Sequence, residues 1–242
     1  EARKATRTQL YHGADVIRLK ASGRVGSDAY TLPWDTEVDR SEIRAITEEA
    51  HRLNKKVAAH AYSSQTVSDC VLEGVDSIEH GVMIDIETIK LMSENNTFLV
   101  PTMNAFNSYL MPDAEKRYPA YRLNRGRPMA TIQRQNFSEY LKHNLSIALG
   151  SDGPRPGSPP GSSAREIELL VDAGMDNLSA INAATLNGAK LLGIDNNTGS
   201  VESGKFADLI VLNADPLKDI SVLTKSENIQ VVIIDGNIVK NE

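Results

Sequence analysis

Two histidines twenty residues apart carry the clearest chemical signal in this sequence. His60 ends the run KVAAH, and His80 ends SIEH just before Gly81. A lone histidine is most often a hydrogen-bonded core residue, but a neutral imidazole is also the commonest metal ligand. Because both residues end short runs typical of strands, we expect the two rings to reach one ion at about 2.0–2.1 Å.

A carboxylate and two basic side chains extend this set. Asp152 follows the apolar run IALGS. It could cap a helix or a turn, but beside two histidines we interpret it as a metal ligand and the proton acceptor of a hydrolytic reaction. Lys20 and Arg18 share one face of a predicted strand. A lysine inside a barrel is costly unless it is paired or modified, and a carbamate on its amine could bridge two metal ions.

Two further residues take their expected orientation from strand alternation. Tyr62 shares the face of His60, where its hydroxyl could hydrogen-bond a substrate carbonyl or carboxylate, or its ring could fill the core. Glu79 precedes His80 and is expected to face outward, as a structural partner. Three other histidines are expected at the surface: His12, His51 and His143.

The elements that must position these side chains alternate along the chain. Short apolar runs predict strands at residues 15–20, 56–62, 77–80, 97–102 and 146–150. Helical segments are predicted at residues 40–53, 65–73, 86–94 and within 113–143. This alternation is typical of βα units and a parallel sheet. In a (β/α) barrel, the carboxyl ends of the strands carry the active site.

The last third of the chain has a different pattern. Residues 153–163 are rich in Pro, Gly and Ser and predict a loop beside the substrate. Helices are predicted at 164–173 and 178–192, and strands at 206–212 and 230–239, the latter with the hairpin signal Asp235-Gly236. We therefore divide the chain into a partial barrel, residues 1–192, and C-terminal strands of a small β domain, residues 193–242.

Composition excludes several classes of protein. The net charge of −6 argues against a nucleic-acid partner. No apolar run approaches the roughly 20 residues that span a bilayer, so we expect no membrane partner. The single cysteine rules out an intrachain disulfide and leaves the compartment open.

Several stretches resemble the amidohydrolase superfamily, and most of all its imidazolonepropionase-like and prolidase-like branch. They are GADVIRLKASG, KVAAHAYSS, DSIEHGVMID, IALGSDGP and TGSVESGKFADLIVLNADPLKDI. The resemblance covers nearly the whole chain. It implies a (β/α)8 barrel with a small β-sandwich, and a centre of one or two divalent metal ions, first of all zinc. It also implies that His60 and His80 are ligands, that Asp152 activates the water, and that Tyr62 lies in the substrate pocket.

Two features depart from the family pattern. The HxH motif, which supplies two ligands from the first barrel strand, occurs nowhere in the chain. We therefore expect the chain to hold barrel strands four to eight, completed by an N-terminal segment or another chain, or associated into oligomers. The place of the family's bridging lysine is taken by Arg18, which cannot be carboxylated. Either Lys20 takes that role and Arg18 contacts the substrate, or the bridge is absent.

The sequence and the resemblance together predict a metal-dependent hydrolase. Its substrate would be a small molecule or dipeptide with an amide, Xaa-Pro-like peptide or cyclic amide bond. The ion could equally be Zn, Mn, Co or Fe. Two alternatives stay open: a catalytically incomplete fragment without the HxH ligands, and a deaminase-like or dihydroorotase-like enzyme.

Overall fold

The computed structural model describes residues 1–26 and 31–241, which form two compact units. Unit 1 comprises Glu1–Thr102 and Phe106–Ile147, and unit 2 comprises Met103–Ala105 and Ala148–Glu242. The predicted division into a partial barrel, residues 1–192, and C-terminal strands of a small β domain, residues 193–242, stays a prediction. Within the described ranges, no helix is both long enough and apolar enough to cross a membrane.

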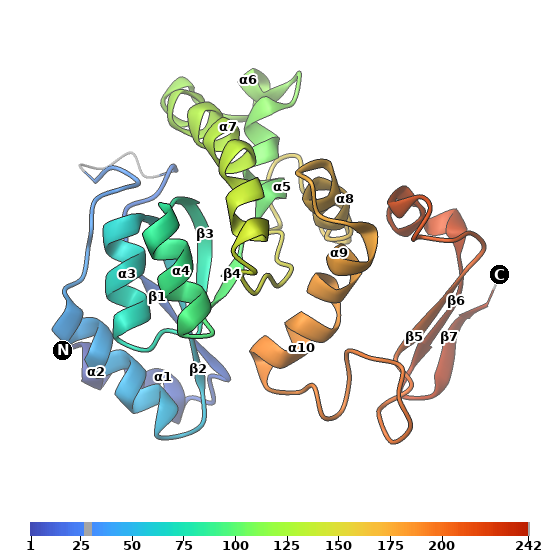
Figure 1. The fold of residues 1–242 in the computed structure, drawn as a ribbon, viewed down its shortest axis with the longest axis horizontal. Helices are drawn as coiled ribbons and strands as arrows, with labels where there is room; N and C mark the ends of the chain where they lie inside the picture. Colours follow the sequence, from blue (N-terminus) through green and yellow to red (C-terminus); the bar gives the residue numbers. More distant parts are fainter. Residues whose placement is uncertain (27–30, 242) are drawn as a thin grey trace. The chain divides into compact units, whose positions relative to one another are not determined.

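A parallel sheet in the order β1-β2-β3-β4 forms the centre of unit 1 (Figure 1). Its strands are β1 (Val16–Lys20), β2 (Lys56–Ser63), β3 (Ser77–Met83) and β4 (Phe98–Val100). The predicted parallel α/β arrangement is confirmed. The closed barrel, the assignment to strands four to eight and the expected pairing of the open edge at β1 stay predictions.

The fifth predicted strand, at residues 146–150, was wrong. Among the described residues this segment forms only one isolated parallel bridge, between Leu99 and Ile147. The ladder does not continue as a strand, because the amide of Leu149 donates to the carbonyl of Ala183 instead.

Helices α2 (Arg40–His51) and α3 (Ser64–Leu72) pack on one face of the sheet, and α4 (Ile86–Glu94) packs beside α3 (Figure 1). These three helices end within two residues of their predicted positions. Alternate strand residues beneath them are buried: Ile17, Leu19, Val57, Ala59, Ile78 and Leu99. This apolar burial is the main favourable contribution to the stability of the sheet.

The opposite face of the sheet carries a polar row. The strand register pairs Lys20 with His60, His60 with Glu79, and Glu79 with Val100. Paired residues of parallel strands point to the same side, so Glu79 shares the face of His60. Its predicted outward orientation was wrong. Strand alternation, applied from His80 backwards, fails because His80 has a φ of 77°, which turns the chain out of the regular strand.

The long helix α7 (Ala120–Lys142) supports the irregular backbone near the ends of β3 and β4. Tyr140 donates to the carbonyl of Gly81 at 2.8 Å, and Gln133 donates to the carbonyl of Pro101 at 2.5 Å. The two helix residues are seven positions apart and lie on one face of α7. They satisfy buried carbonyl groups that would otherwise be costly. Short helices precede α7: α5 (Met103–Asn107), η1 (Ser108–Leu110) and α6 (Ala114–Arg117).

Unit 2 contains helices and a small antiparallel sheet. The helices are α8 (Arg165–Asp172), α9 (Asn177–Ala184), α10 (Leu186–Leu192), η2 (Ile220–Thr224) and η3 (Ser226–Asn228). The strands β5 (Leu209–Leu212), β6 (Ile229–Ile234) and β7 (Asn237–Asn241) pair in that order. Asp235 and Gly236 form the predicted turn, with φ angles of 49° and 76°, as the favoured hairpin turns require.

A buried carboxylate attaches helix α1 (Ala2–Tyr11) to α2. Glu49 is 2% exposed and accepts from Arg3, Arg7 and Arg52 at 2.5–2.7 Å. The hydrogen bonds from Arg7 and Arg3 lower the pKa of Glu49 to about 2. Helix α1 was not predicted, because its sequence is mostly polar.

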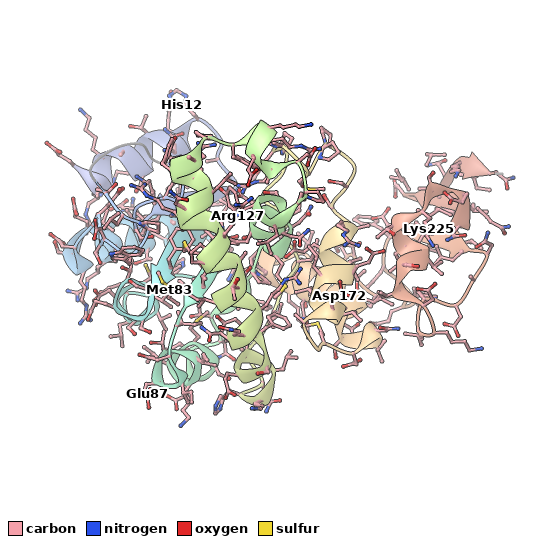
Figure 2. All side chains as sticks on the ribbon, turned by 90° about the horizontal axis from the view of Figure 1, so that it is seen from above. His12, Met83, Glu87, Arg127, Asp172 and Lys225 are labelled. Atoms are coloured by element: carbon pink, nitrogen blue, oxygen red, sulfur yellow. The ribbon has the colours of Figure 1, made fainter. Side chains whose placement is uncertain are left out.

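The surface histidines follow their prediction in part. His12 comes directly after α1 and is exposed (Figure 2), and His51 at the end of α2 is exposed as well. His143, after α7, is half-buried.

Replacing Glu49 by glutamine should lower the thermal midpoint of unfolding by a few degrees, because a neutral amide cannot replace an anion among guanidinium groups. Since the folded-state pKa is lowered, this stabilisation is complete above about pH 4.5 and is lost as the pH falls towards 2. Thermal unfolding followed by circular dichroism between pH 7 and pH 2.5 checks the effect. The difference between the wild-type and Glu49→Gln proteins should shrink in acid.

The matched control for this experiment is Glu48→Gln. Glu48 is an exposed neighbour that pairs with Arg3 at 2.7 Å, and exposed pairs contribute little. Equal effects of the two substitutions, or an effect of Glu49→Gln that does not depend on pH, would contradict the assignment.

Candidate functional site

His60 and His80 lie in direct contact in unit 1, and both are buried, at 2% and 3% exposure. Nδ1 of His60 lies 2.9 Å from Nε2 of His80. The ring centroids are 4.7 Å apart, and the ring planes are nearly perpendicular, at 83°. The structure therefore brings together the two histidines that the sequence singles out.

The outer nitrogen of each ring has an oxygen partner. Nε2 of His60 lies 2.9 Å from the carbonyl oxygen of Gly23, and Nδ1 of His80 lies 2.6 Å from the hydroxyl oxygen of Thr102. A carbonyl oxygen only accepts, so Nε2 of His60 is the donor there. A neutral His60 then has its lone pair on Nδ1, the atom that faces His80.

The donor chemistry of this pair fits a divalent cation. The facing nitrogens form a hydrogen bond at 2.9 Å, which needs one hydrogen between them, and a divalent cation bound there would take the place of that hydrogen. Two neutral imidazole nitrogens that converge on one point are typical of zinc-type sites. Across residues 1–26 and 31–241, no group of three or more His, Cys, Asp or Glu side chains is arranged to hold a metal. The two histidines are thus a partial ligand set.

The carbonyl of Gly23 is held in place by antiparallel backbone pairing of residues 22–23 with residues 35–36. Ser22 forms a bridge with Thr36, and the amide of Gly23 donates to the carbonyl of Asp35 at 3.0 Å. A Cβ atom at position 23 would lie 2.0 Å from the carbonyl oxygen of Leu32. Only glycine allows this close approach of two backbone segments, which fixes the acceptor for the first histidine.

Two aromatic rings pack against the histidine pair. Tyr62 stacks on His80 with ring centroids 5.0 Å apart and 13° between the planes, and it meets His60 edge-on at 4.8 Å. Phe106 meets Tyr62 and His80 edge-on at 6.1 and 5.8 Å. These contacts restrict ring rotation, and burial strengthens electrostatic interactions at the two imidazoles. Tyr62 thus lies where strand alternation predicted it.

The basic residues of β1 lie on the same face of the sheet. Nζ of Lys20 lies 2.5 Å from Oε2 of Glu37. Partial burial acts to raise the pKa of Glu37, but the hydrogen bonds from Lys20 and Thr31 outweigh it, so the pKa is lowered. An ammonium group in such a pair must lose both its proton and its partner before it can form a carbamate. Arg18, two residues earlier, is exposed.

Asp152 belongs to unit 2 and is about a third exposed, at 34%. Its carboxylate pairs with Arg155, three residues later. Its φ of 49° is in the left-handed region, which aspartate adopts more readily than most residues. Within the described chain, residues 153–163 contain no helix or strand, as predicted. The convergence of Asp152 with the two histidines of unit 1 stays a prediction.

A buried carboxyl group that the sequence analysis missed organises residues near Asp152 in unit 2. Glu166 is fully buried and accepts from the backbone amides of Met103 at 2.5 Å and Asn104 at 2.7 Å. The Asn104 side chain donates to the hydroxyl of Ser158 at 2.8 Å. Burial raises the pKa of Glu166 to about 8, against the two amide hydrogen bonds, and the charge of Asp152 acts in the same direction as burial.

The raised pKa of Glu166 makes the stability of the fold depend on pH. Between about pH 4.5 and 8 the folded chain keeps a proton that the unfolded chain loses. The free energy of unfolding should therefore fall as the pH rises, by at most about 1.4 kcal/mol per pH unit from this one group. Urea unfolding at pH 5, 6, 7 and 8 checks this, and Glu166→Gln should flatten the decline.

Asp172→Asn is the control for Glu166→Gln, because Asp172 is an exposed carboxylate on the same helix α8 (Figure 2). It should leave the pH dependence unchanged. An unaltered slope in Glu166→Gln would mean that this carboxyl group is ionised in the folded chain throughout the range.

Comparison with known proteins identifies a family whose sequence pattern this chain matches. Residues 1–239 match the family model described as "Amidohydrolase family". The ochratoxinase of Aspergillus niger is 31% identical over 242 residues, which are 99% of this chain and 49% of that protein. The imidazolonepropionase of Picrophilus torridus is 36% identical over 104 residues, 42% of this chain and 26% of that protein.

A solved structure is similar over the whole chain. The crystal structure of a Xaa-Pro dipeptidase with bound methionine in the active site matches with a TM-score of 0.89 and 33% identity, over 99% of this chain and 58% of that one. The resemblance to the imidazolonepropionase-like and prolidase-like branch is thereby confirmed. The chain spans about half the length of the first curated relatives that it matches, at 49%.

Proposed function

This chain belongs to the amidohydrolase family, and on that premise we propose that it forms part of a metal-dependent hydrolase of amide or peptide bonds. The observation that carries the proposal is the buried pair of facing nitrogens, Nδ1 of His60 and Nε2 of His80, 2.9 Å apart. The likeness to a Xaa-Pro dipeptidase supports dipeptides with a carboxyl-terminal proline as the first substrate class to test.

Each predicted residue has a role in this proposal. His60 and His80 would hold one divalent ion, with zinc as the first candidate. Such an ion would polarise the substrate carbonyl and lower the pKa of water towards 7. Asp152 would accept a proton from that water and deliver it to the leaving amine. Tyr62 would hydrogen-bond the substrate through its hydroxyl, and Arg18 would offer a cation to a substrate carboxylate.

The number of ions depends on Lys20. A second, bridged ion would need a carbamate, which Arg18 cannot form. Lys20 would first have to leave Glu37, with which it pairs at 2.5 Å. The ion pair favours a centre without the carbamate bridge, and we propose a single ion at the two histidines.

Metal content tests the centre directly. After incubation with Zn²⁺ and desalting, the protein should retain about one ion per chain, measured by inductively coupled plasma mass spectrometry. His60→Asn and His80→Asn should each weaken metal binding by at least about tenfold, because each removes a nitrogen ligand. Lys20→Ala should leave the stoichiometry unchanged, whereas a loss of metal in Lys20→Ala would instead make Lys20 a ligand.

The control for the metal experiment is His51→Asn. His51 is an exposed histidine that pairs with Asp76 at 2.8 Å. It is the last residue of α2 and does not belong to the pair of His60 and His80. Equal metal loss in this variant would mean that binding is non-specific.

Hydrolysis of Xaa-Pro dipeptides tests the reaction. The amount of released proline should rise with time in the Zn²⁺-loaded protein, stop after treatment with a chelator and return when Zn²⁺ is restored. Asp152→Asn should lower kcat by about 10²–10⁴-fold, as expected for loss of a general base, while metal content changes less. Metal binding without hydrolysis of any dipeptide or N-acyl amino acid would refute the proposed substrate class.

A further inference from the structure

The side of α7 that packs against β3 carries three polar side chains in a row. Gln133 and Tyr140 are buried, at 1% and 0% exposure, and Asn136 between them is half-buried. Their spacing along the sequence places them on one face of the helix. Polar side chains in such a position are costly unless they are hydrogen-bonded. We call Gln133, Asn136 and Tyr140 the polar row of α7.

The polar row donates to backbone carbonyl groups where the pairing of β3 with β4 ends. The regular register between these strands stops at Glu79 and Val100. Beyond that point, at 2.5–3.2 Å, Gln133 donates to Pro101, Asn136 to Val82 and Tyr140 to Gly81. Nε2 of Gln133 also lies 3.5 Å from the carbonyl oxygen of His80. Side-chain donors of α7 therefore take over where the backbone ladder stops.

The backbone held in this way contains a left-handed turn. His80 and Gly81 have φ angles of 77° and 52°, and a non-glycine residue in this region persists only when its surroundings hold it there. In a regular strand, Glu79 and His80 would point to opposite faces. Since Glu79 shares the face of His60, a regular strand would direct His80 away from His60. The turn is thus what brings the two histidines together.

We propose that Gln133 and Tyr140 are positioning residues for the candidate metal site. Their hydrogen bonds to the backbone hold the left-handed turn, and the turn directs the His80 ring towards His60. An amide and a phenol suit this task, because each can donate to a carbonyl group from a buried position without carrying a charge. The inference rests on the proposed function only in naming a metal ion as the species that the histidines bind.

Two substitutions remove the donors and nearly keep the size of the side chains. Gln133→Met has no amide, and Tyr140→Phe has no hydroxyl. The control is Leu123→Ala on the same helix. Leu123 is buried, at 5% exposure, and its truncation should lower the thermal midpoint through lost packing while the polar row stays intact.

The direct test is nuclear magnetic resonance of metal-free protein with ¹³C-labelled histidine rings, at about pH 8.5, well above the ordinary imidazole pKa of about 6.5. Tyr62 stacks on His80 with centroids 5.0 Å apart, so its ring current displaces the ring protons of His80 from those of the exposed His12. Both donor variants should move the His80 ring protons towards the His12 positions, and Leu123→Ala should not. Unchanged His80 ring protons in both donor variants would overturn the proposal.

Co²⁺ affinity, followed by visible absorption, gives the second measurement. Loss of outer hydrogen bonds around a metal site typically weakens binding 10–100-fold. We therefore expect a loss of about tenfold in Gln133→Met and in Tyr140→Phe. Leu123→Ala should keep the wild-type affinity although its thermal midpoint is lower. A role in stability alone would not produce this split, and equal losses of affinity in all three variants would overturn the proposal.

The two measurements also separate this proposal from the proposed function. A wild-type protein that binds no Co²⁺, while the His80 ring protons respond as expected, would refute the metal-dependent hydrolase and support the positioning role. If Gln133→Met does not fold, Tyr140→Phe, which removes a single oxygen atom, decides by the same criteria.

Discussion

The contact between Nδ1 of His60 and Nε2 of His80 constrains the rest of unit 1. These two nitrogens lie 2.9 Å apart and need one hydrogen, or a cation, between them. Each ring must therefore be held from its outer side, and both outer partners come from irregular backbone. Gly23 approaches another backbone segment too closely for any side chain, and Thr102 is in the left-handed region. The regular part of the fold must offset these local costs.

One face of the sheet provides apolar packing, and the other face carries the polar side chains of the candidate site. The face under α2 and α3 buries aliphatic residues such as Val57 and Ile78, which are both 0% exposed, and gives the strands a fixed register. That register places a cation, an imidazole and a carboxylate side by side on the other face: Lys20, His60 and Glu79. Helix α7 then satisfies the carbonyl groups where β3 and β4 leave regular geometry. Apolar packing thus fixes the position of the sheet, and the irregular backbone at the ends of its strands sets the direction of the polar side chains.

The regular half of this arrangement could be predicted from the sequence, and the irregular half could not. Alternating apolar residues revealed the four strands and the face of Tyr62. No local sequence pattern marks Thr102 as left-handed. The positive φ of His80 was likewise not predictable from the sequence, and for this reason the predicted direction of Glu79 was wrong. Two signals were available but missed: Gln133 and Tyr140 recur at helical spacing on α7, and Glu166 stands directly before the apolar Ile167 on α8. A polar residue on an apolar helix face is expected to have a buried partner.

The two buried carboxyl groups show why such residues cannot be interpreted from burial alone. Glu49 and Glu166 are 2% and 0% exposed, yet their pKa values move in opposite directions, to about 2 and about 8. Arginine hydrogen bonds outweigh desolvation for Glu49, whereas two neutral backbone amides do not outweigh it for Glu166. Their stability contributions therefore change in separate windows, below and above about pH 4.5, and both favour folding near that pH.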